Sequence, residues 1–234
     1  MGKRQGVELM KIKWLGQSGY VLSDGRTVIY IDPYLSDSVS RIENRPRMRR
    51  IPVKPQDVKA DGIICTHNHL DHLDIDAIPL MDKNMTFYAP TDCKETLTQL
   101  GVTNYAEFDE GAVYRIGDFK ITAVFADHTV PAVGVLAEYG TERLYFTGDT
   151  YYNKRLEEIR CDYLFVCING RLGNMNVTDA VKLDKIIKPR LAVPNHYDMF
   201  ESNSEDPLKF TDNVSNGFIM EFDREYEVTD GCLI

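Results

Sequence analysis

THNHLDH, residues 66–72, holds three of the five histidines in this chain, together with one aspartate. The apolar run GIICTH, residues 62–67, leads into it and predicts a strand that is buried on both faces. Imidazole nitrogens and carboxylate oxygens are ligands of divalent metals. The first two histidines can reach one ion, whereas the closing Asp-His pair points elsewhere and can serve a second. The stretch therefore predicts a metal site at a strand end.

The remaining histidines occupy the same kind of position further along the chain. His128 closes the apolar run ITAVFADH, His196 closes LAVPNH, and Asp149 closes RLYFTGD in the same way. Two strand-rich blocks, each followed by strand–helix alternation, predict a layered α/β protein with mixed sheets. Functional groups in such folds gather where strands end and loops begin. The pattern predicts that these side chains meet in one pocket.

Local signals predict several individual elements. A hairpin turns at Asp24-Gly25, and Pro55 opens a helical turn. The stretch LDIDAIPLMDK, residues 73–83, predicts a helix, and residues 176–187 predict another that is capped by Asn176.

Composition limits the classes of function. The chain has 234 residues, 43% of them hydrophobic and 27% charged, and no low-complexity linker divides it, so we expect a single domain. The net charge of −9 repels polyanions, and no nucleic-acid partner is expected. No signal peptide or membrane-spanning run is evident, and the five cysteines form no CxxC pair. A reduced, cytoplasmic protein is therefore expected.

Several motifs resemble a known family. THNHLDH resembles the signature of metallo-β-lactamase-fold hydrolases, and FTGD and PNHYD match later motifs of that superfamily in order. KWLGQSGYVL, IDPYLSDS, YFTGDTYYN, INGRLGNMN and VPNHYDMFESNSEDP resemble the L-ascorbate-6-phosphate lactonase subgroup, although this chain is shorter than that lactonase. The resemblance implies a four-layer αββα sandwich of two mixed sheets. It implies one hydrolase domain over residues 10–234, with residues 1–9 as a flexible extension.

The same resemblance implies a set of metal ligands. One ion would be bound by His67, His69 and His128, and a second by Asp71, His72 and His196, with Asp149 bridging both. These ligands are nitrogen and oxygen only, which suits Zn²⁺, Mn²⁺ or Fe²⁺. The lactonases favour manganese and the wider superfamily favours zinc, so the metal stays open.

An arginine-rich segment is a candidate for substrate binding. RIENRPRMRR, residues 41–50, holds five arginines, and guanidinium groups bind phosphate and carboxylate in a bidentate manner. Arg47, Arg49 and Arg50 are the predicted anion-binding residues, and replacing them should raise KM more for a phosphorylated substrate than for a neutral analogue. The alternative is a solvated loop whose charges pair with surface acids.

Two other segments carry further candidates. In INGRLGNMN, residues 168–176, Asn169 and Arg171 are predicted to touch substrate or to support metal ligands. Tyr197, next to His196, is a candidate hydrogen-bond donor to an oxyanion, with core packing as the alternative.

Taken together, the residues predict a metal-dependent hydrolase, and the resemblance implies a lactonase-like enzyme that acts on a small anionic ester or lactone. Hydroxide held by the metals would attack the carbonyl, and Asp71 would orient that water and accept its proton. A phosphodiesterase or nuclease on the same core is one alternative. Another alternative is a redox di-iron protein, although such proteins have a carboxylate at the position of His69. The last is a non-catalytic metal-binding module. Whether the chain forms a homo-oligomer stays open.

Overall fold

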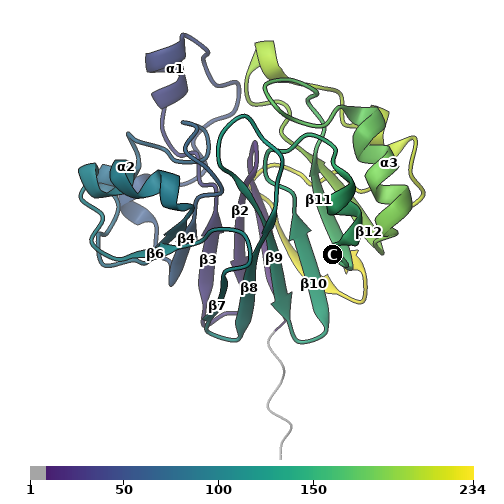
Figure 1. The fold of residues 1–234 in the computed structure, drawn as a ribbon, viewed down its shortest axis with the longest axis horizontal. Coiled ribbons are helices and arrows are strands. Elements are labelled where there is room, and N and C mark those ends of the chain that lie inside the picture. Colours follow the sequence, from purple (N-terminus) through teal and green to yellow (C-terminus); the bar gives the residue numbers. More distant parts are fainter. Residues whose placement is uncertain (1–8) are drawn as a thin grey trace, which may run out of the picture.

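The computed structural model describes residues 9–234, and within them the strands form two mixed sheets (Figure 1). In spatial order, the first sheet contains β14 (Cys232–Leu233), β13 (Glu225–Thr229), β1 (Lys11–Gly16), β2 (Gly19–Ser23), β3 (Val28–Ile31), β4 (Gly62–Ile64), β5 (Phe87–Ala89) and β6 (Tyr105–Glu107). The second contains β12 (Leu191–Asn195), β11 (Tyr163–Cys167), β10 (Glu142–Phe146), β9 (Val133–Tyr139), β8 (Phe119–Phe125) and β7 (Val113–Ile116).

Helical segments connect and flank the sheets. The α-helices are α1 (Ser38–Glu43), α2 (Lys94–Gln99), α3 (Val177–Ile187) and α4 (Leu208–Thr211). Short 3₁₀ turns are η1 (Pro55–Asp57), η2 (Ile78–Leu80), η3 (Thr91–Cys93), η4 (Lys154–Glu158) and η5 (Glu201–Asn203).

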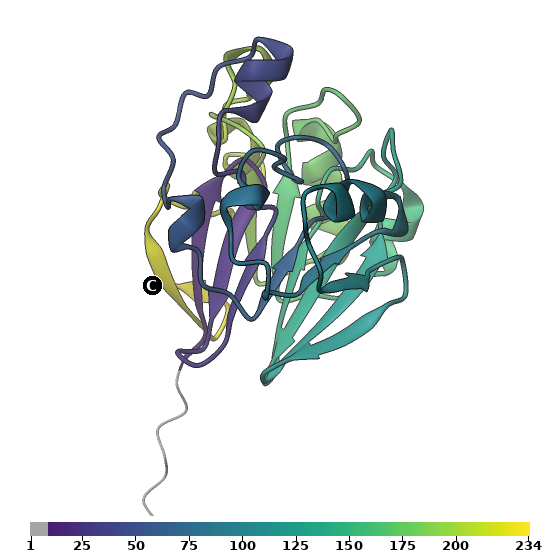
Figure 2. The ribbon, with the colours of Figure 1, turned by 90° about the vertical axis from the view of Figure 1, so that its left-hand side faces the viewer.

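Each sheet has an antiparallel part and a parallel part. The strands β3 to β6 run parallel to one another, as do β10 to β12. The carboxyl ends of the parallel strands face the end of the molecule that carries α1, and the turns of the hairpins β2–β3, β7–β8 and β9–β10 lie at the opposite end (Figure 2). Loops that leave these strands therefore gather at one end of both sheets.

Aromatic side chains fill the space between the sheets. Tyr20 of β2 lies 4.9 Å from Phe146 of β10 and 5.1 Å from Phe165 of β11, measured between ring centroids. Phe146 and Phe165 stack on each other at 4.5 Å. These contacts seal the two sheets face to face, because aromatic pairs at such distances add to the area that they bury.

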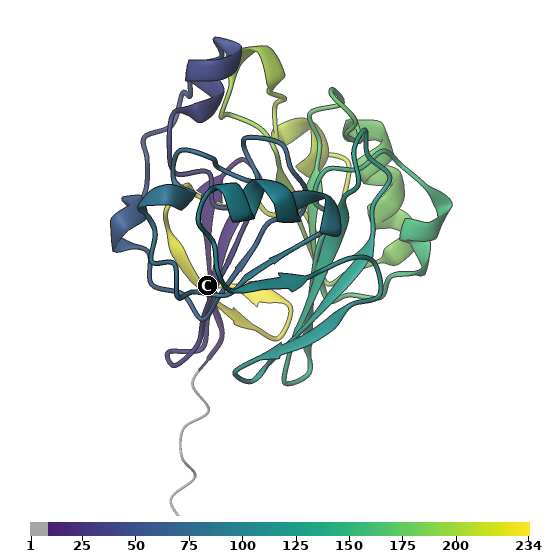
Figure 3. The same cartoon turned by 60° about the vertical axis from the view of Figure 1, so that its left-hand side comes forward.

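The helices cover the two outer faces. Leu183 and Ile187 of α3 pack on the outer face of the second sheet. Leu97 of α2 packs with Ile63 and Phe87 on the outer face of the first, where Figure 3 shows the helix in front of the strands. The arrangement confirms the predicted αββα sandwich. Within residues 9–234, no helix is long and apolar enough to cross a membrane.

Most of the local predictions are confirmed. The hairpin β2–β3 turns at Asp24, whose carboxylate accepts from the main-chain N–H of Thr27 at 2.7 Å. Asn176 caps α3 by accepting from the Asp179 N–H at 2.9 Å, and Pro55 opens η1. The extension predicted for residues 1–9 lies, apart from Leu9, outside the described residues.

The helix predicted over residues 73–83 is wrong. This segment contains turns and η2 only. Asp74 is buried, and its carboxylate accepts from the N–H groups of Asp76 and Ala77, which favours a turn over a continuous helix. Pro79 then removes a further main-chain donor. The same carboxylate accepts from the Leu35 N–H at 2.8 Å and from the Ser36 hydroxyl, so it joins this segment to the loop after β3.

Replacing Asp74 with alanine should destabilise the protein. The change leaves the buried N–H groups of Leu35 and Ala77 without acceptors, so the free energy of unfolding should fall by roughly 2–4 kcal/mol. Urea denaturation followed by circular dichroism measures this loss. Asp118→Ala is the matched control: its exposed pair with Arg26 should contribute less than about 1 kcal/mol. Equal midpoints for the two variants would contradict the assignment.

Candidate metal centre

Seven side chains meet where the two sheets expose their strand ends. Four of them follow β4, and the others follow β8, β10 and β12. We call this group the His–Asp cluster: His67, His69, Asp71, His72, His128, Asp149 and His196. The structure thus brings together every residue predicted from sequence as a metal ligand. Side chains separated by up to about half the chain become neighbours because both sheets end at the same place.

Three histidines form one side of the His–Asp cluster. His69 Nδ1 lies 3.0 Å from His67 Nε2 and 3.2 Å from His128 Nε2. One nitrogen from each of these residues lies within 4.8 Å of the others, close enough for a single ion. His67 is fully buried, whereas His69 and His128 are partly exposed toward solvent.

The other side combines two histidines with two carboxylates. The Asp149 carboxylate lies between His72 and His196: Oδ1 is 3.3 Å from His72 Nε2, and Oδ2 is 3.1 Å from His196 Nε2. Asp71 Oδ2 is 3.8 Å from the Nε2 atoms of both histidines. Asp149 also groups with His67 and His72, so it touches both halves of the cluster.

Hydrogen bonds to the ring nitrogens that face away from the cluster fix the orientation of His72 and His128. Asp32, which follows β3, accepts from His72 Nδ1 at 2.7 Å and from the Thr66 hydroxyl at 2.7 Å. The Gly173 carbonyl accepts from His128 Nδ1 at 3.0 Å. Such partners turn the opposite ring nitrogen toward the interior of the cluster and set its tautomer. Asp32 was not predicted as a functional residue, although its place after an apolar strand is the same signal that marks Asp149.

The histidines on the first side are held neutral. Burial lowers the pKa of His67 well below its ordinary value, and the neighbouring His72 lowers it further. Burial also lowers the pKa of His69 and of His128. Neutral imidazole is the form that binds a metal, so these groups are ready to act as ligands near neutral pH.

The opposite electrostatic balance holds on the second side. Burial favours the neutral acid of Asp149, but His196 and His72 outweigh it and hold the pKa of this carboxyl well below its usual range. Burial likewise opposes charge on His72, but Asp149, Asp32 and Asp71 together raise its pKa well above the ordinary value. Several carboxylates thus converge on one imidazole and favour positive charge there.

The residues present fit a divalent cation. His72 Nε2 and Asp149 Oδ1 are buried and face each other, yet neither has a hydrogen-bond partner. Unsatisfied buried polar atoms are costly, and a cation bound by both would remove that cost. The donor set is neutral imidazole and carboxylate, which matches borderline ions such as Zn²⁺, Mn²⁺ and Fe²⁺.

A cavity opens in front of the His–Asp cluster. It has a volume of about 230 Å³, and the cluster contributes His69, Asp71, Asp149 and His196 to its lining. Among the described residues, its other walls carry the apolar Val39, Leu172 and Phe200 and the charged pair Glu43 and Arg45. The cavity therefore offers a small ligand an apolar surface, a guanidinium and direct access to the cluster.

The three arginines predicted to bind substrate do not line this cavity. Arg47 donates to the Ser36 carbonyl at 2.7 Å and lies over the ring of Tyr34 at 4.8 Å. Arg49 pairs with Asp198, and Arg50 pairs with Asp223. These contacts hold the loop after α1 in position. A role in substrate binding stays a prediction, and the geometry favours Arg45 instead.

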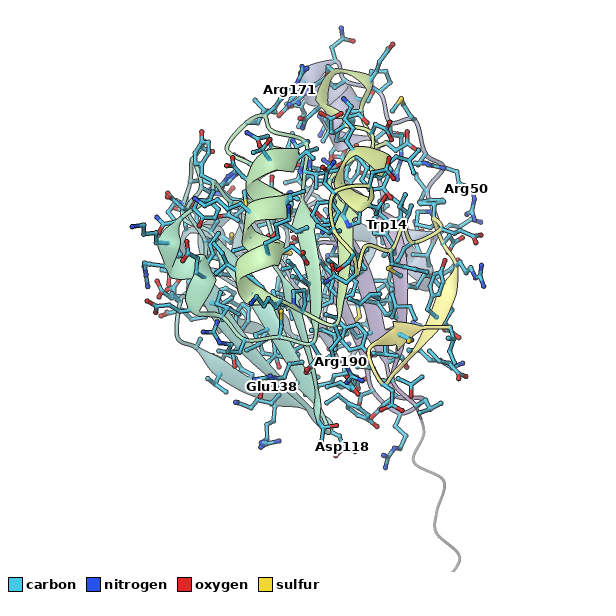
Figure 4. All side chains as sticks on the ribbon, turned by 90° about the vertical axis from the view of Figure 1, so that its right-hand side faces the viewer. Trp14, Arg50, Asp118, Glu138, Arg171 and Arg190 are labelled. Atoms are coloured by element: carbon cyan, nitrogen blue, oxygen red, sulfur yellow. The ribbon has the colours of Figure 1, made fainter. Side chains whose placement is uncertain are left out.

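The candidates in residues 168–176 and Tyr197 lie in three different settings: Asn169 supports the cluster, Arg171 is exposed and Tyr197 is buried in the core. Asn174 donates to Asp149 Oδ2 at 3.0 Å and to Asn169 Oδ1 at 2.9 Å, so Asn169 supports the cluster through Asn174. Arg171 donates to the Ser202 carbonyl at 3.1 Å and lies near the end of the molecule that carries the site loops (Figure 4). Tyr197 is buried against Trp14, with ring centroids 5.0 Å apart, which agrees with the packing alternative.

Gln17 also belongs to this region and was not predicted. Its amide nitrogen lies 2.7 Å from Asp71 Oδ2 and 3.1 Å from His196 Nε2. Gln17 lies in the motif KWLGQSGYVL, which resembles the lactonase subgroup, but no role was predicted for it.

Comparisons with known proteins agree with this architecture. A family model described as "Beta-lactamase superfamily domain" matches residues 27–197. A UPF0173 metal-dependent hydrolase of Archaeoglobus fulgidus is 32% identical over 222 residues, covering 86% of this chain and 89% of that protein. A UPF0173 protein of Pyrococcus furiosus is 31% identical over 207 residues, with the same coverage.

A solved structure shows the same fold. Igni18, described as a novel metallo hydrolase from Ignicoccus hospitalis, superposes with a TM-score of 0.76 at 22% sequence identity, covering 94% of this chain and 99% of that one. The family match and the two relatives decide the assignment: the chain belongs to the metallo-β-lactamase superfamily and, within it, to the UPF0173 family of metal-dependent hydrolases.

Proposed function

We propose that this hydrolase opens small anionic esters or lactones, in a lactonase-like reaction. The observation that carries the proposal is the cavity in front of the His–Asp cluster, which combines apolar walls with a single arginine, Arg45, among its lining residues in the described part of the chain. The resemblance to L-ascorbate-6-phosphate lactonases supports the same substrate class. The cavity volume of about 230 Å³ suits a compact substrate.

In this proposal the His–Asp cluster holds two divalent ions, zinc or manganese, with iron as the further option. His67, His69 and His128 would hold the first, and Asp71, His72 and His196 the second, with Asp149 shared. When bound, such ions lower the pKa of a coordinated water and stabilise negative charge on an attacked carbonyl.

Asp71 is the proposed proton acceptor. It lines the cavity, and 16% of its side chain is exposed, so water in the cavity can reach its carboxylate. Gln17 donates to one of its oxygens at 2.7 Å, which restricts rotation of the carboxylate. A carboxylate held in this way can orient a water molecule and accept its proton as the carbonyl is attacked.

Arg45 is the proposed anion-binding residue. Its guanidinium lies 6.0 Å from the ring centroid of Phe200 and pairs with Glu43. A carboxylate or phosphate on the substrate would compete with Glu43 for this cation. Guanidinium binds both anions through two parallel hydrogen bonds, so the substrate would be held with a defined orientation.

Replacing Asp71 with alanine should lower kcat by at least about 100-fold, because a positioned general base contributes that much or more. Hydrolysis of a panel of lactones and esters measures the loss, and far-UV circular dichroism checks that the variant is folded. Asp118→Ala, far from the site, should retain full activity. Full turnover by the Asp71 variant would overturn its assignment.

Removing metal with a chelator should abolish hydrolysis and lower Tm, because an ion that binds only the folded state stabilises it. Adding Zn²⁺ or Mn²⁺ should restore both properties, and elemental analysis gives the number of ions per chain. Undiminished hydrolysis by metal-free protein would contradict the proposal. Turnover of bis(p-nitrophenyl) phosphate without any lactone or ester would replace the proposed reaction with phosphodiester hydrolysis.

Replacing Arg45 with methionine should raise KM for an anionic ester roughly 10- to 100-fold, which corresponds to the loss of one charge-assisted hydrogen-bond pair. KM for a neutral ester of the same size should change little. Arg50→Met is the matched control, because Arg50 pairs with Asp223 outside the cavity. If Arg50→Met raised KM for the anion and Arg45→Met did not, the anion site would lie at the loop after α1, as predicted from sequence.

A further inference from the structure

Gln17 is held in an unusual main-chain conformation between β1 and β2. It is fully buried and has a φ of 52°. Its carbonyl accepts from Trp14 Nε1 at 3.0 Å and from the main-chain N–H of His196 at 3.2 Å. Trp14 lies inside the molecule (Figure 4) and is 2% exposed. His196 is also left-handed, with a φ of 60°. Two residues in a region that L-amino acids rarely adopt are thus joined main chain to main chain, which is typical of functional sites.

The side chain of Gln17 reaches two members of the His–Asp cluster at once. Its Nε2 lies 2.7 Å from Asp71 Oδ2 and 3.1 Å from His196 Nε2, while those two atoms are 3.8 Å apart. Its Oε1 is buried without a partner. The contact with Asp71 is therefore the directed interaction that sets the position of this amide.

The chemistry of an amide suits this position. It donates to the carboxylate without adding a positive charge that would repel a cation. Asp71 and His196 arrive on different loops, one after β4 and one after β12. Their ligand atoms are 3.8 Å apart, and His72 contacts both residues. The side chain of Gln17 holds Asp71 by donating to Oδ2, and its main-chain carbonyl holds His196 by accepting from the His196 N–H at 3.2 Å. The lone pair of His196 Nε2 is then left for a cation.

We propose that Gln17 is a positioning residue, which holds Asp71 and His196 in the geometry that binds the second divalent ion. This inference rests on the ligand assignment of the proposed function. It does not depend on the substrate class. In the described part of the chain, Gln17 makes no hydrogen bond to His67, His69 or His128 of the first group, so the effect should be specific to one ion.

The test compares metal binding in Gln17→Met, Gln17→Asn and Gln99→Met. Methionine keeps the size of the side chain and removes the donor, and asparagine keeps the amide but shortens its reach. Gln99 is the matched control, because its amide donates to Glu95 on the surface of α2. Full-length metal-free protein is titrated with Zn²⁺, and separately with Mn²⁺, against a chromogenic chelator.

Wild type and Gln99→Met should take up two ions. Both Gln17 variants should bind the first ion with unchanged Kd and the second about 10- to 100-fold more weakly, the usual effect of removing a hydrogen bond to a metal ligand. Thermal unfolding of the metal-free proteins checks for a purely structural role. That role would lower Tm and weaken both ions alike, and this result would overturn the inference.

Three other outcomes also decide between the proposals. Binding of both ions by the Gln17 variants as in wild type would overturn the inference, as would uptake of only one ion by wild type. If wild type binds two ions and the Gln17 variants lose the second, but no ester or lactone is opened, the proposed substrate class fails and the inference about Gln17 stands.

Discussion

The site depends on one buried carboxylate, Asp32. It accepts from the main-chain N–H and the hydroxyl of Thr66, both at 2.7 Å, and from His72 Nδ1 at 2.7 Å. Asp32 follows β3 and Thr66 follows β4, so these bonds tie two adjacent strand ends together and turn His72 Nε2 toward Asp149. Hydrogen bonds to a charged group contribute about 1.5–3 kcal/mol each, and losing the acceptor would leave buried donors unsatisfied. The remaining geometry of the cluster builds on this anchor.

Several aspartate carboxylates lie at or near the cluster, and the net charge of the chain does not reveal this concentration of negative charge. Three carboxylates in this region are buried, those of Asp32, Asp74 and Asp149, and Asp71 is partly buried. All of these except Asp74 contact a histidine of the cluster. Burying like charges together is unfavourable unless cations compensate them. Positive charge in the centre of the cluster, from protons or from metal ions, is therefore a requirement of the fold as well as of the chemistry.

Much of this arrangement was predictable from sequence. The runs that end in His67, His128, Asp149 and His196 are apolar enough to identify as strands, and parallel strands bring their carboxyl ends to one edge. The αββα architecture and the gathering of these side chains follow from that. The segment 73–83 was predicted wrongly because its conformation depends on bonds from Asp74 to the distant loop after β3.

Other features of the site could not be predicted, for a related reason. Arg45 and Arg50 are chemically alike, and only the course of the loop decides which one lines the cavity. Gln17 lies in a motif that resembles the lactonase subgroup, but its residue type does not mark it as a contact of metal ligands. Its role arises from the left-handed turn that carries it to Asp71 and from the Trp14 bond that keeps it there.

The order of the cluster along the chain has a consequence for biosynthesis. The strands β5 to β12 lie between His67 and His196 in the sequence. β12 leads into His196 and is the last of these strands to be synthesised, so its pairing with β11 forms late. The first histidine group needs the chain only as far as His128, whereas the second also needs His196. Closure of the full His–Asp cluster must therefore wait until translation has passed β12 and reached His196.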